Sequence, residues 1–221
     1  MTDSRNEGEA RPPADLDTSV AHPARVYDYW LGGKDNFAAD REAAEQAIAA
    51  NPTIVPGVRT NRAFLRRAVS YLASEAGIRQ FLDVGTGLPS ANNTHQVAQA
   101  VAPGSKVVYV DNDPIVLLHA RALLTGTPQG ATAYLDADVR DPGSVLAQAA
   151  ETLDLAEPVA LMLLAILQLI PDDANPHVIV ERLMDGLIEP GVVQPHRWRP
   201  EPGDMWPDQE VTAWSGVARK N

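Results

Sequence analysis

The segment Phe81-Leu-Asp-Val-Gly-Thr-Gly87 predicts a buried strand that runs into a tight glycine turn. Gln80 to Val84 is a short apolar run, and the two glycines let the backbone pass close beneath a ligand. The helix expected next, Ala91 to Ala102, would offer free N–H groups at its start. The segment therefore predicts a ligand site at the end of this strand.

Strands and helices alternate after this segment. Further strands are expected at Lys106 to Val110, Ala131 to Leu135 and Pro158 to Leu164, and helices at Pro114 to Leu124, Pro142 to Ala150 and Pro176 to Leu187. Before it, helices are expected from Pro23 to Gly32-Gly33, over Asn36 to Ala50, and over Thr60 to Ala76 after breaks at Asn51-Pro52 and Pro56-Gly57. The pattern predicts an α/β fold, with a doubly wound, mostly parallel sheet covered by helices on both faces.

The length of 221 residues fits one domain, which we place at residues 18–221. Residues 1–17 are polar and charged, and we expect them to be a disordered tail without the apolar core of a signal peptide. From Glu189 the chain is rich in proline, and only Gly191 to Val193 and Val217-Ala218 look strand-like.

The composition narrows the classes of partner. A net charge of −11 argues against nucleic-acid binding, and we interpret Arg59, Arg62, Arg66 and Arg67 as a solvated helix face. The chain has no cysteine, which excludes disulfides and thiolate chemistry. The longest apolar run, Val159 to Ile170, is too short to cross a bilayer. We expect a cytoplasmic protein with no membrane partner.

Two acidic residues at neighbouring strand ends point to the ligand. Asp83 lies two residues before Gly85, where a carboxylate suits the ammonium group of S-adenosylmethionine (SAM) better than a pyrophosphate. Asp111 follows Gly87 by 24 residues (111 − 87) and is placed to accept hydrogen bonds from ribose hydroxyls. NAD uses the same ribose contact, so Asp111 alone does not separate the two cofactors.

The third and fourth strand ends complete this site. Asp138 can accept the amino group of adenine while Val139 packs on the ring. The nearby acids Asp136 and Asp141 raise the alternative of a hard metal ion, but their spacing matches no calcium loop and we predict no metal site. Leu163 to Ile166 is apolar, which argues against the usual methylation of adenine or glutamine nitrogen atoms.

Several stretches together resemble one actinobacterial family of class I SAM-dependent methyltransferases, formerly a domain of unknown function. They are Thr18 to Phe37, Arg59 to Phe64, Phe81 to Pro89, Val110 to Pro114, Asp136 to Val139 and Leu161 to Pro171. The N-terminal stretch is the most specific, and the resemblance covers about residues 18–200.

The resemblance implies a Rossmann-like methyltransferase fold and SAM as cofactor. It places Asp83, Gly85 and Gly87 at the methionine end, Asp111 at the ribose, and Asp138 and Val139 at the adenine. Thr86, Asn112 and Leu164, next to these residues or at the fourth strand end, are also expected to bind the cofactor. The resemblance also implies that residues 18–76 form a helical lid whose Arg25 and Tyr29 face the cofactor.

The chain departs from the family after Leu187. Met184 to Leu187 runs almost directly into Ile188 to Gly191, where relatives continue into a further strand and helix. We therefore expect the sheet to lack that strand and helix near the C-terminal end.

The expected function is methyl transfer from SAM to a small-molecule acceptor. No side chain stands out as a general base; we expect Tyr27 and Tyr29 to line the acceptor pocket and His95 to lie on a helix surface. The shortened chain keeps open the alternative of a binding module that holds SAM or S-adenosylhomocysteine without turnover. An NAD-dependent oxidoreductase is disfavoured by Asp83 and by the missing third glycine.

Overall fold

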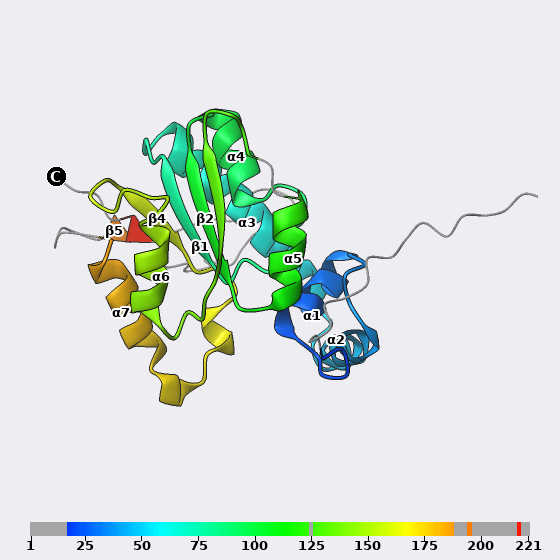
Figure 1. Ribbon diagram of the computed structural model, residues 1–221. Coiled ribbons are helices and arrows are strands. Elements are labelled where there is room, and N and C mark those ends of the chain that lie inside the picture. Colours follow the sequence, from blue (N-terminus) through cyan, green and yellow to red (C-terminus); the bar gives the residue numbers. More distant parts are fainter. Residues whose placement is uncertain (1–16, 124–125, 188–193, 196–215, 218–221) are drawn as a thin grey trace, which may run out of the picture.

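A parallel sheet of four strands forms the centre of the fold (Figure 1). The computed structural model describes residues 17–123, 126–187, 194–195 and 216–217. The strand order is β3 (Ala131–Asp136), β2 (Lys106–Asp111), β1 (Gln80–Val84), β4 (Val159–Met162), with every neighbouring pair parallel. The prediction of a parallel α/β sheet is confirmed. Because β2 and β4 lie on opposite sides of β1, the chain reverses its winding there, and ligands of such sheets bind beyond the strand ends at that point.

Helices cover both faces of this sheet. One face packs against α3 (Ile54–Ser74) and α4 (Thr94–Val101) through Phe81, Val107 and Met162. The other packs against α6 (Pro142–Ala149) and α7 (Pro176–Asp185) through Leu82, Val84 and Val108. Successive strand residues point to opposite faces, so the unbroken apolar runs in β1 and β2 supply both cores.

Two helices begin at different residues from those predicted. The α3 helix begins at Ile54 and not at Thr60, because Pro56 lies in its first turn, where its missing N–H has no intrahelical partner. The α4 helix begins at Thr94 and not at Ala91, because Asn92 has a positive φ of 61° and Asn93 is its extended N-cap. The other predicted helices agree with α1 (Pro23–Leu31), α2 (Ala38–Ala50), α5 (Pro114–Leu123), α6 and α7 to within a few residues.

Beyond β4, two short 3₁₀ helices, Leu167–Leu169 and Asp172–Ala174, lead into α7. Within the described residues, the sheet ends at β4 on this side. A separate antiparallel pair, β5 (Gln194–Pro195) and β6 (Gly216–Val217), brings β6 close to β4 (Figure 1). The strand predicted at 191–193 and most of the predicted tail at 1–17 lie outside the described residues.

A buried ion pair joins the two N-terminal helices. Nε of Arg25 in α1 lies 3.2 Å from Oδ1 of Asp40 in α2, and the two residues are 3% and 0% exposed. Asp40 also accepts backbone N–H groups from His22 at 2.9 Å and Phe37 at 2.8 Å. One carboxylate therefore determines how the chain enters both helices.

We expect Asp40→Asn to lower the free energy of unfolding by about 3–5 kcal/mol, because it leaves the Arg25 guanidinium buried without a counter-charge. Denaturant unfolding measures this change. Glu45→Gln on the exposed face of α2, which accepts a hydrogen bond from Tyr29, is the matched control and should cost about 1 kcal/mol or less. Equal losses from the two variants would contradict a special role for the buried pair.

Candidate cofactor-binding site

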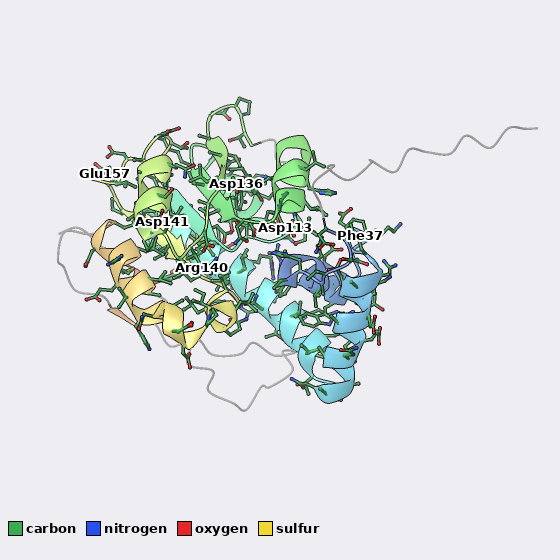
Figure 2. The ribbon with its side chains drawn as sticks, turned by 60° about the horizontal axis from the view of Figure 1, so that its bottom comes forward. Phe37, Asp113, Asp136, Arg140, Asp141 and Glu157 are labelled. Atoms are coloured by element: carbon green, nitrogen blue, oxygen red, sulfur yellow. The ribbon has the colours of Figure 1, made fainter. Side chains whose placement is uncertain are left out.

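A cavity of about 390 Å³ lies beyond the carboxyl ends of the four strands. Its size is within the range of small-molecule sites. Its walls come from all four strand ends, from α1 and α3, and from the loop after β4; the lining residues that carry the argument below are Asp83, Gly87, Asp111, Asp138, Leu164 and Arg62. Figure 2, in which the lower side of Figure 1 comes forward, shows Arg140 and Asp113 at this end of the molecule. The strand ends singled out in the sequence thus meet in one cavity.

The glycine turn at the floor of the cavity is tied to β2. The N–H groups of Gly85 and Thr86 donate to the carbonyl oxygen of Val110 at 2.9 and 3.3 Å. The N–H of Gly87 donates to Oδ2 of Asp111 at 2.7 Å. The turn therefore has its three amide donors already paired, which leaves little to offer an anionic ligand.

Gly85 is required by its surroundings as well as by its backbone. Its φ is +72°, and a Cβ placed on it would lie 2.6–2.8 Å from side-chain atoms of Ile166. Gly87 also has a positive φ of 67°, but a Cβ there would meet nothing within 4 Å. The turn thus packs tightly on the loop after β4 at one glycine and is open at the other.

Two of the N–H groups at the start of α4 are paired within the protein, contrary to the expectation that they are free. The N–H of His95 donates to the hydroxyl of Tyr109 at 2.8 Å, and Gln96 accepts the N–H of Asn93 at 2.9 Å. Nδ1 of His95 lies 2.8 Å from the same hydroxyl, and the residue is 2% exposed. The prediction that His95 lies on the helix surface is wrong, because its ring packs edge-on against Tyr109.

Asp83 is a buried acid with a single described hydrogen-bond donor. Its carboxylate is 5% exposed, and the Thr94 hydroxyl donates to Oδ2 at 2.6 Å. Burial raises the pKa of Asp83 from 3.8 to about 6, against the opposing effects of Thr94 and the Arg62 charge. A positive group entering the cavity beside Asp83 would relieve this cost.

Asp111 faces the same cavity from the end of β2. It is 7% exposed, and its Oδ1 accepts the N–H of Asp113 at 3.0 Å. Burial raises the pKa of Asp111, and the hydrogen bonds from Asp113 and Gly87 partly oppose that rise. Asn112 is exposed and lines the cavity beside it.

Asp138 and Val139 line the side of the cavity nearest β3. Asp138 is held by Arg140, whose Nε lies 2.9 Å from both carboxylate oxygens. This pairing lowers the pKa of Asp138. Leu164, with Ile166 and Leu169, makes an apolar wall after β4, where Ala165 has an unusual positive φ of 58°.

Helices α1 and α3 close one side of the cavity, but only one of the three α1 side chains predicted to face it does so. Tyr27 lines the cavity as expected. Arg25 and Tyr29 do not line it: Arg25 is paired with Asp40, and the Tyr29 hydroxyl donates to Glu45 at 2.6 Å. Tyr29 follows Tyr27 by two residues, so a helix turns its side chain to another face.

Two histidine–aspartate contacts attach these helices to the β2–α5 unit. Nδ1 of His22 lies 2.8 Å from Oδ2 of Asp113, and Nε2 of His119 lies 3.1 Å from Oδ1 of Asp35. The N-terminal segment contributes the histidine to one pair and the aspartate to the other. His22 also lines the cavity, a role that the sequence did not suggest.

Arg62 and Asn61 are two further polar residues that line the cavity and that the sequence did not predict. Arg62 does not lie on a solvated basic face as predicted, because its Nη2 donates to the carbonyl oxygens of Ala91 at 3.1 Å and Asn92 at 3.3 Å. The Asn61 side chain donates to the Tyr27 hydroxyl at 2.9 Å, which connects α3 to α1.

The fold and the cavity define a class I, Rossmann-like protein with acidic side chains around a cavity at its strand ends. The chain belongs to the S-adenosyl methyltransferase family, whose model matches residues 9–188. The cofactor of that family is SAM, as the residues around Asp83 and Asp111 predicted. The match ends one residue after Leu187, where the sequence departs from the expected pattern.

Two solved structures from actinobacteria resemble the chain. A DUF574 family protein from Streptomyces avermitilis is 51% identical over 77% of this chain, with a TM-score of 0.75. A proposed methyltransferase from Thermobifida fusca is 46% identical over 81% of this chain, with a TM-score of 0.74. The chain spans 66% and 67% of the lengths of these two proteins. No protein of curated function matches the chain significantly.

We expect S-adenosylhomocysteine to bind more weakly as the pH falls through about 6, because only ionised Asp83 attracts its ammonium group. The affinity should fall toward tenfold per pH unit below that point. Asp83→Asn should bind more weakly at pH 7.5 and lose this slope. Calorimetric titration between pH 5 and 8 measures both effects.

Asp83→Asn should change the stability of the ligand-free protein in the opposite direction from its effect on binding. A folded-state pKa raised above 3.8 means that ionised Asp83 lowers folding stability at pH values above about 6, and that this cost is absent below about 4. Asp83→Asn should therefore raise the Tm of the ligand-free protein at pH 7.5 while weakening its binding. A variant with a lower Tm and an unchanged pH slope would show that Asp83 is not the titrating group.

Proposed function

We propose that this chain is a SAM-dependent methyltransferase that acts on a small-molecule acceptor. The observation that best supports this proposal is the buried Asp83 carboxylate beside a glycine turn whose three N–H groups are already paired. Such a site favours a ligand with a positive amino group over one with a pyrophosphate. This supports SAM and disfavours NAD, although both contain adenosine.

The residues that line the cavity fit the polar groups and the adenine ring of SAM. In this proposal Asp83 receives the ammonium group, Asp111 the ribose hydroxyls, and Asp138 the adenine amino group, with Val139 and Leu164 against the ring. Gly85, Thr86, Gly87 and Asn112 shape the floor and edge. We do not include Arg25 and Tyr29 among the proposed cofactor-binding residues, because neither lines the cavity.

The bound cofactor would supply a methyl group on a sulfonium, which is already an activated leaving group. The protein then needs chiefly to align the acceptor and exclude water. Leu65, Leu164, Ile166 and Leu169 provide an apolar wall for this, and Tyr27 and Asn61 add polar groups from the helices. An apolar wall beside polar groups suits a small organic acceptor.

His22 is the best-placed group for proton transfer, if the acceptor must lose a proton. Its Nδ1 contact with Asp113 would fix the ring orientation and leave Nε2 for a partner. The hydrogen bonds from His22 and the Ile115 N–H outweigh the effect of burial and lower the pKa of Asp113, so this carboxylate stays ionised near neutral pH.

A binding module without turnover is the second candidate. It is favoured by the described part of the sheet, which ends at β4 on one side. Every proposed cofactor residue precedes residue 188, so SAM binding does not depend on the segment that the longer relatives carry. Methyl transfer to any compound in a metabolite screen with radiolabelled SAM would contradict this candidate.

We expect SAM and S-adenosylhomocysteine to bind the purified protein and NAD not to bind. Asp111→Asn should weaken S-adenosylhomocysteine at least tenfold, because it removes a charged acceptor from the ribose. Calorimetric titration with the three compounds measures these affinities.

Asp136→Asn is the matched control for this variant. Asp136 ends β3 in register with Asp111 and is exposed, so the same change of charge should leave binding within about twofold. Tight NAD binding without binding of SAM would refute the proposed function.

A further inference from the structure

Arg62, on α3, lines the same cavity as Asp83, and its charge acts on that carboxylate. Its Nη2 is fixed by Ala91, Asn92 and the side-chain oxygen of Asn93, at 3.1 to 3.3 Å. All of the hydrogen bonds described for Arg62 use Nη2, so Nε and Nη1 keep their donors. The guanidinium is thus held at one end and open at the other.

Arg62 and Asp83 are close enough to interact electrostatically, yet no direct ion pair joins them among the described residues. The charge of Arg62 lowers the pKa of Asp83, but burial dominates and leaves that pKa raised. A positive and a negative side chain therefore face one cavity without neutralising each other. A ligand end that carries both charges would satisfy both.

Several other groups that could hold an anion near Asp83 are already engaged. The N–H groups of Gly85, Thr86 and Gly87 donate to Val110 and Asp111. The first turn of α4 has the His95 N–H paired with Tyr109. Arg140 lines the cavity too, but it is bound to Asp138 on the β3 side.

We propose that Arg62 binds the carboxylate of the cofactor's amino-acid end while Asp83 binds its ammonium group. The cavity then recognises a whole α-amino acid and selects SAM over nucleosides that lack the carboxylate. The three contacts of Nη2 hold the planar guanidinium in place, so that a remaining N–H donor on Nε or Nη1 can reach the carboxylate. This inference rests on the proposed function.

S-adenosylhomocysteine and its decarboxylated form, S-adenosyl-3-thiopropylamine, test the inference. The two compounds share the adenosine and the ammonium group and differ only in the carboxylate. The wild-type protein should bind the first at least tenfold more tightly by calorimetric titration. Arg62→Gln should weaken S-adenosylhomocysteine about 10- to 100-fold and change the decarboxylated compound less than about threefold.

Arg66→Gln, one turn further along α3 and exposed, is the control for net charge and should change neither affinity. Arg62→Lys keeps the charge but loses the planar guanidinium that Nη2 holds in place, so it should fall between the wild type and Arg62→Gln. It also provides the test if Arg62→Gln does not fold.

Two contrary results separate the claims. Equal weakening of both compounds by the Arg62 variants would overturn the inference, because it would mean that Arg62 only supports the loop at Ala91 to Asn93. Failure of the wild-type protein to bind either compound would overturn the proposed function, and the inference with it.

Discussion

The hydrogen bonds between the Gly85–Gly87 turn and the end of β2 are the constraint on which the site depends. By donating to Val110 and Asp111, the three amides hold the first two strand ends in one rigid corner. The same bonds use the donors that a phosphate would need. Packing of Ile166 on Gly85 adds the end of β4 to this corner. One backbone arrangement therefore shapes the cavity and limits the ligand chemistry that it accepts.

Charge is distributed unevenly around that corner. Asp83 and Asp111 are buried, and burial raises the pKa of both carboxyl groups. The floor of the cavity therefore favours a ligand with a positive charge or with hydroxyl groups. Arg140 contacts Asp138 and His22 contacts Asp113, so these two carboxylates already have partners within the protein. Negative charge thus remains unbalanced at only two of these four acidic positions, and both lie on adjacent strands.

No helix of the described residues has the length and apolar character needed to cross a membrane.

Much of this could be predicted from the sequence, because strand ends in a parallel sheet share one edge. The β1 strand, Asp83, Asp111, Asp138 and Leu164 follow from that rule alone. Arg62 and His22 could not be predicted from it, because they reach the cavity from helices whose rotation depends on tertiary packing. The same reason explains Arg25 and Tyr29, whose helix was predicted correctly while the faces of its side chains were not. The start of α4 was missed because a single left-handed residue, Asn92, delays the helix.

The buried charge of Asp83 also connects ligand supply to the lifetime of the protein. A folded chain that carries an uncompensated carboxylate gives up part of its stability until a ligand neutralises it, and binding to the folded state alone restores that stability by mass action. Chains without ligand unfold more often and are exposed to proteolysis for a larger fraction of the time. Under the proposed function, a ligand that neutralises Asp83 would therefore also slow the turnover of the protein.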